Sequence, residues 1–134
     1  DKPTVLISAG VGITPMMAML GTLLENQTEQ PTWFLHACEN KNQHTYADQL
    51  KNVANQLDKL HYYYWYKQDD ADDNQALTGL MQLDRLQFEL PLTDGHFYIC
   101  GPVGFMRFIK QQLLDLNVAA DRIHYEVFGP HSDI

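Results

Sequence analysis

"TVLISAGVGITPMMAML" (residues 4–20) begins as an apolar run typical of a buried strand and ends with apolar residues at helical spacing. Gly10 and Gly12 separate the two parts, and glycine lets a backbone turn sharply and approach a ligand closely. Thr14 is predicted to cap the helix, and Pro15 to be its first residue, since proline has no N–H to leave unpaired there. Pro15 also stands where the dinucleotide fingerprint G-x-G-x-x-G has its third glycine, so the motif alone is incomplete.

A second turn of the same kind occurs later in the chain. "CGPVG" (residues 100–104) follows the run His96–Cys100 and precedes a helical pattern at about 102–116. Each turn would present the N-terminus of a helix, where unpaired N–H groups and a partial positive charge favour a phosphate group. Two such turns in one crevice predict a nucleotide site.

The pattern of strands and helices predicts an α/β fold, a doubly wound sheet of five parallel strands. Helices are expected at about 15–26, 44–57 and 102–116, with one or two helical turns near 77–86. The simplest strand order is 3-2-1-4-5, which reverses between the first and fourth strands and brings both glycine turns to one crevice. The expected strands are Thr4–Ser8, Thr32–Cys38, His61–Tyr66, His96–Cys100 and Ile123–Phe128.

Composition limits the class of protein. The chain has 134 residues, of which 45% are hydrophobic, enough for one domain with its own core. A net charge of −8 argues against nucleic acid and anionic membranes as partners. No apolar stretch is long enough to span a bilayer, so a cytoplasmic location is expected. Two cysteines suggest reduced thiols, and no His/Cys spacing indicates a metal site. The acidic stretch "DDADDN" (69–74) departs from a calcium loop and indicates a solvated loop.

Four stretches together resemble the nicotinamide-binding domain of the ferredoxin-NADP reductase superfamily, and most closely that of bacterial flavohemoglobins. The resemblance covers nearly the whole chain. The motifs G-x-G-x-T-P and C-G-P are shared by the superfamily, whereas C-G-P-V-G-F-M with the ending E-x-F-G-P is similar to flavohemoglobins in particular. The stretches are "LISAGVGITPMMAML" (6–20), "HACENKNQHTYADQL" (36–50), "YICGPVGFMRFIKQQLLDLNV" (98–118) and "IHYEVFGPH" (123–131).

The resemblance implies roles for particular residues. The first turn would hold the pyrophosphate and ribose of the dinucleotide, and the C-G-P turn would lie beside the nicotinamide. An aromatic residue near the carboxyl end would cover the flavin ring. The matching positions are Gly10, Gly12, Thr14 and Pro15 for the first turn; Cys100, Gly101 and Pro102 beside the nicotinamide, with Val103, Gly104 and Phe105 lining the approach; and Phe128 for the flavin cover, with Glu126 nearby. Cys100, Glu126 and Phe128 are the expected catalytic residues.

The same resemblance implies an electron path through other domains. Hydride would pass from NADH to FAD, and the flavin would supply electrons singly to a haem that converts bound oxygen and nitric oxide to nitrate. No stretch matches the flavin-binding or globin domains of a flavohemoglobin. We therefore expect a single domain, 1–134, of a longer protein, whose partners are those two domains and which is inactive without them.

The choice between NADH and NADPH is expected to depend on Glu39, which follows the second strand. A carboxylate there can bond the ribose hydroxyls and repel a 2′-phosphate, so NADH is favoured over NADPH. Two alternatives of other classes remain open. One is a reductase domain of another flavoenzyme of the superfamily that feeds an iron-sulfur acceptor, and the other is a nucleotide-binding module without catalysis.

Overall fold

A computed structural model describes residues 3–10, 13–25, 31–38, 60–66, 76–78 and 80–125, with residues 13, 14, 24 and 76–78 described by their backbone alone. Its centre is a six-stranded sheet with the order β4-β3-β2-β1-β5-β6, in which every neighbouring pair is parallel. The strands are β1 (Thr4–Ala9), β2 (Thr32–Cys38), β3 (Leu60–Tyr66), β4 (Ala76–Thr78), β5 (His96–Cys100) and β6 (Ile123–Tyr125).

The five expected strands are all present in the expected order, so the doubly wound fold is confirmed. The sixth strand, β4, was not expected, because three residues are too few to show a strand period. It pairs with β3, which is therefore not the edge strand. The helical turns expected near 77–86 are reduced to the 3₁₀ helix η3 (Leu83–Leu86). The last expected strand, Ile123–Phe128, corresponds to β6, which ends at Tyr125. Residues 126–128 lie outside the described residues.

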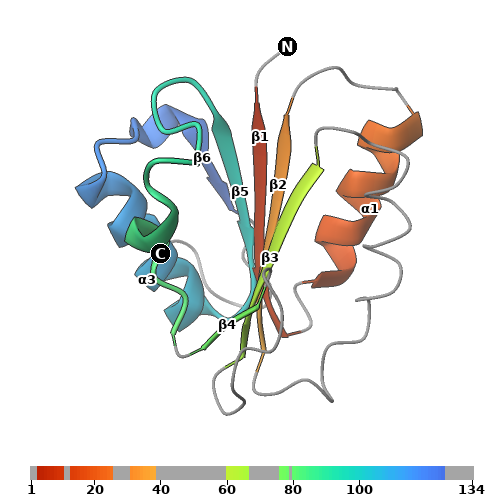
Figure 1. Ribbon diagram of the computed structural model, residues 1–134, viewed down its shortest axis with the longest axis horizontal. Helices are drawn as coiled ribbons and strands as arrows, with labels where there is room; N and C mark the ends of the chain where they lie inside the picture. Colours follow the sequence, from red (N-terminus) through yellow and green to blue (C-terminus); the bar gives the residue numbers. More distant parts are fainter. Residues whose placement is uncertain are drawn as a thin grey trace.

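Two long helices cover opposite faces of the sheet (Figure 1): α1 (Ile13–Glu25) on one face, and α3 (Val103–Asp115) with η3 on the other. Alternate strand residues divide the core between the two faces. The helix expected at 44–57 lies outside the described residues. The α3 face is packed by residues that include Val5, Ile7, Trp33, Leu35, Phe97 and Ile99, with Met106 and Ile109 of the helix, whereas the α1 face holds Leu6, Phe34, Cys100, Met16 and Leu20.

The switch point of the sheet lies between β1 and β5. The chain leaves β1 for α1 on one face and leaves β5 for α3 on the other (Figure 1). A crevice forms at the carboxyl edge of such a sheet where the two connections diverge, and ligands of doubly wound proteins bind there. Among the described residues, no helix is long and apolar enough to cross a membrane.

Candidate functional site: two glycine turns at the switch point

The two glycine turns begin next to each other at the carboxyl edge of the sheet. Ser8 and Cys100 are register partners, so Ala9 and Gly101 follow side by side. A Cβ placed on Gly101 would lie 3.3 Å from the Ala9 carbonyl oxygen and 3.0 Å from Cδ2 of Phe105. Real Cβ contacts are rarely so short, so the absence of a side chain at Gly101 lets the turns pack together. The two turns therefore begin as neighbours at this edge, and a shared crevice for a ligand stays a prediction.

Among the described residues, none fills the space beside Gly10 or Gly104 where a side chain would project. Gly10 directly follows β1 and has a φ of +56°, a left-handed conformation that glycine adopts without strain. A Cβ on Gly10 or on Gly104 would meet nothing within 4 Å, and both residues are exposed. A ligand could therefore approach the backbone at both positions.

The helix ends at the crevice carry no negative side chain that would oppose an anion. Neither α1 nor α3 has an acidic residue in its first turn. Pro102 is the N-cap of α3 and makes no side-chain capping hydrogen bond. Helix N-termini with this character attract phosphate, because their N–H groups and dipole are not already neutralised.

The residues expected at the site are placed as follows. Cys100 is fully buried, Gly101, Val103, Phe105 and Pro15 are half-buried, and Pro102 is exposed. The expected capping by Thr14 is wrong, because α1 already begins at Ile13. Thr14 and Pro15 therefore lie within the first turn of the helix, where proline is still tolerated. Residues Gly12, Glu39, Glu126 and Phe128 lie outside the described residues, as does the side chain of Thr14.

A buried polar pair beneath the first turn was missed by the sequence analysis, which considered the histidines only as metal ligands. Ser8 Oγ and His36 Nδ1 are hydrogen-bonded at 2.8 Å, with both residues at most 2% exposed. Ser8 is the register partner of both His36 and Cys100. The bond ties the carboxyl end of β1 to β2 directly below Gly10. The only sequence signal is a serine interrupting an apolar run just before the glycine turn.

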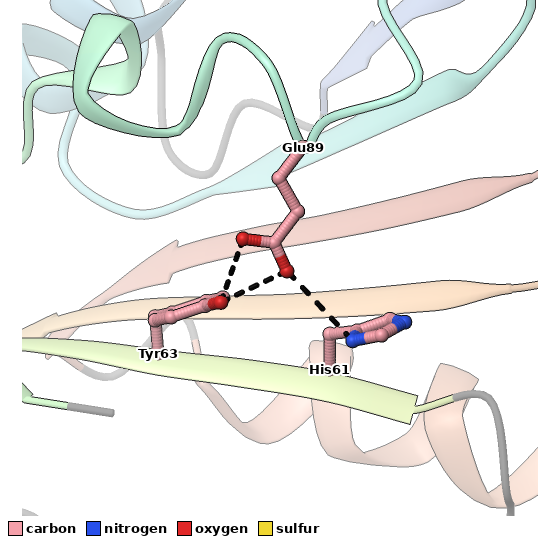
Figure 2. A network of polar contacts seen from close by, with 3 residues as sticks. All are labelled: His61, Tyr63 and Glu89. Carbon is pink, nitrogen blue, oxygen red and sulfur yellow. Dashed lines mark hydrogen bonds and ion pairs between the residues drawn. The ribbon is translucent and has the colours of Figure 1, made fainter. Parts of the chain in front are cut away.

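A second polar cluster lies on β3, on the α3 face of the sheet (Figure 2). The Tyr63 hydroxyl donates to the Glu89 carboxylate, whose oxygens lie 2.8 and 2.7 Å away. His61 Nδ1 is 3.7 Å from the same carboxylate, and its ring stacks on Trp33 at 4.9 Å. Burial, together with the hydrogen bond and charge of Glu89, raises the pKa of Tyr63 to about 12. The cluster fastens the segment after η3 to the sheet.

Replacing Glu89 by glutamine is expected to lower the pKa of Tyr63 toward its ordinary value of 10.0. The folded protein holds this proton more tightly than the unfolded chain, so the resulting stability is complete below about pH 10 and is lost as the pH rises towards about 12. Absorbance of the phenolate during an alkaline titration measures the change. Tyr63→Phe identifies which part of the absorbance change belongs to Tyr63, since the tyrosine that titrates at the highest pH should be missing from the curve of this variant. An unchanged curve for Glu89→Gln would contradict the assignment.

Three comparisons relate this chain to known proteins. A flavohemoprotein of Vibrio cholerae is 46% identical over 134 residues, covering all of this chain but 32% of that protein. The crystal structure of the flavohem-like FAD/NAD binding domain of nitric oxide dioxygenase from V. cholerae has a TM-score of 0.88 and 45% identity, covering 97% of this chain and 52% of that one. A flavohemoglobin of Malassezia yamatoensis with bound FAD and heme has a TM-score of 0.85 at 26% identity, covering 96% of this chain and 32% of that one.

These matches extend over the fold and the site together. The chain spans about a third of the length of the curated relatives it matches. Residues 6–111 match the family described as the oxidoreductase NAD-binding domain, a span that includes most of β1, both glycine turns and most of α3. By this match over more than half of its length, and with the fold and glycine turns described above, the chain belongs to the oxidoreductase NAD-binding domain family.

Proposed function

We propose that this chain binds NADH in the crevice between the two glycine turns and presents it to a flavin on a neighbouring domain. The observation that supports the proposal is the close approach of Gly101 to Ala9, where a Cβ on Gly101 would lie 3.3 Å from the Ala9 carbonyl oxygen, so that the two turns begin side by side. Such an arrangement at a switch point suits a dinucleotide, whose pyrophosphate and nicotinamide need two separate binding surfaces.

Each turn would serve one part of the ligand. The backbone at Gly10 and the start of α1 would hold the pyrophosphate, because no side chain blocks a close approach there. Gly101 and Pro102 would support the nicotinamide ring. The Cys100 thiol is fully buried and directly precedes Gly101, so it would shape the floor below the ring rather than react as a nucleophile. NADH supplies the hydride.

The flavin and the final acceptor would belong to other domains. Similarity to flavohemoproteins, one of which holds FAD and heme, supports FAD as the hydride acceptor and haem as the site of nitric oxide dioxygenation. Glu126 and Phe128 remain the residues we expect at the flavin, whereas Cys100 is expected beside the nicotinamide. Cofactors hold the redox chemistry in this scheme, and the chain supplies binding and orientation.

Amide NMR shifts during titration with NADH test the proposal. We expect shifts at Gly10, Gly12, Gly101 and Gly104, and none at Gly21 or Gly95. Gly21 lies within α1 and Gly95 precedes the opposite end of β5, so both are controls within the same spectrum. Shifts confined to the controls, or absent at the turns under saturating NADH, would refute a site in this crevice.

Cofactor selectivity is tested with NADPH and the variant Glu39→Gln. The wild type is expected to bind NADH more tightly, because the carboxylate repels the 2′-phosphate and bonds the ribose hydroxyls. Glu39→Gln removes the charge at nearly constant size and should narrow the difference between the two affinities. An unchanged ratio of the two affinities would show that Glu39 does not select the cofactor.

Electron transfer from NADH to an added FAD domain would exclude the alternative of a nucleotide-binding module without catalysis.

A further inference from the structure

Two histidines meet on the sheet away from the crevice. His96 opens β5, and His124 is the middle residue of β6. His96 Nδ1 lies 3.0 Å from His124 Nε2, and the ring planes differ by 9°. The Tyr98 ring packs on His124 with centroids 4.7 Å apart. Both histidines are half-exposed.

The 3.0 Å contact brings two potential metal-binding nitrogens to one point. In the hydrogen bond, one of the two nitrogens carries the proton and the other accepts it. The proton can move through solvent to the second nitrogen of its own ring, since both rings reach the surface. Both imidazoles then remain neutral, and both lone pairs become available where the hydrogen bond was.

The separation of the nitrogens indicates which metals fit. Bonds of about 2.0–2.1 Å place two nitrogens roughly 2.9 Å apart at a right angle and roughly 3.4 Å apart in a tetrahedron. The observed 3.0 Å is closer to the right-angle value, which is typical of square-planar and octahedral ions. We propose that His96 and His124 form a binding site for one divalent cation that accepts neighbouring imidazole ligands at a right angle, the class of Cu²⁺ and Ni²⁺.

The remaining coordination positions would be filled by water. Among the residues that the structure describes, no group of three His, Cys, Asp or Glu side chains gathers to hold a metal. A site with two protein ligands is open and exchangeable. The two rings, now nearly coplanar, must tilt so that both lone pairs point to the ion, and half-exposed side chains have room to do so.

Metal binding would stabilise the pairing of β5 with the edge strand β6. Among the described residues, which end at Tyr125, β6 pairs with β5 at three positions: Phe97↔Ile123, Tyr98↔His124 and Ile99↔Tyr125. An ion bonded to His96 and His124 bridges the two strands. Because it binds the folded chain preferentially, it should raise the thermal midpoint with increasing metal concentration.

Calorimetric titration with Ni²⁺ tests the site, since Ni²⁺ has the required geometry and does not oxidise the two thiols. The wild type should bind one equivalent and melt at a higher temperature. His124→Gln and His96→Gln should each weaken binding at least about tenfold, as loss of a ligand requires. His61→Gln, which removes an exposed histidine on β3, is the matched control and should bind as the wild type does.

The variants also separate a folding defect from loss of the site. Circular dichroism and NMR spectra identify which variants are folded, and either folded variant of the pair suffices for the comparison. Line broadening by Ni²⁺ should be centred on 96 and 124 and should be absent from Gly10 and Gly101. No Ni²⁺ binding by the wild type, wild-type affinity in a folded His96→Gln or His124→Gln, or broadening centred elsewhere would overturn the proposal.

Discussion

Replacing Gly95 by alanine is expected to lower the free energy of unfolding by about 3 kcal/mol, the upper part of the range for overpacked sites. A Cβ at this position would lie 2.6 Å from both Cγ and the carbonyl oxygen of Pro91. The backbone cannot move away easily. The Gly95 N–H donates to the Pro91 carbonyl at 2.8 Å, and its own carbonyl accepts a hydrogen bond from Arg122 at 2.8 Å.

Urea unfolding followed by circular dichroism measures the effect, with Gly21→Ala as the matched control. Gly21 lies within α1, where a Cβ would meet nothing within 4 Å. Alanine is the better helix former, so this substitution should raise the free energy of unfolding by about 0.5–1 kcal/mol. If the urea midpoint of Gly95→Ala equals that of the wild type, the segment at Pro91 moves to accept the Cβ without destabilising the protein.

The sequence was sufficient for the fold where each element had its own periodic signal. Buried parallel strands read as continuous apolar runs, so β1, β2 and β5 were predictable from local composition. The strand β4 was not, because three residues hold a strand only through their pairing with Tyr64–Tyr66 of β3. The start of α1 at Ile13 also differs from the prediction, which began the helix at Pro15.

The candidate site was predictable in outline for a different reason. Glycine spacing marks backbone turns, and the topology of a doubly wound sheet then brings the two turns together. Which side chains meet beneath the two turns depends on the register between neighbouring strands. Ser8 and His36 are 28 residues apart and meet only because β1 and β2 align Ser8 with His36. Glu89 reaches Tyr63 through an irregular segment after η3, for which the sequence has no periodic pattern.

Replacing Gly10 by asparagine is expected to weaken the binding of NADH while the fold is kept. Asparagine tolerates the left-handed backbone better than other residues with a side chain. The chain already has an asparagine in this conformation, Asn117 with a φ of 68°. No atom lies within 4 Å of the position a Cβ would take at Gly10. The new side chain should therefore occupy the open space above the turn instead of straining the sheet.

In the proposed site, that space is where the pyrophosphate approaches the backbone. The dissociation constant for NADH should rise at least about tenfold, equivalent to a loss of about 1.4 kcal/mol. Asn117→Gly, the reverse exchange at the far end of α3, is the control and should leave NADH affinity unchanged. Fluorescence titration gives both constants, and urea unfolding verifies that Gly10→Asn is folded. A folded Gly10→Asn with wild-type affinity would mean that the dinucleotide does not pass over Gly10, and the crevice would then lose its assignment as the binding site.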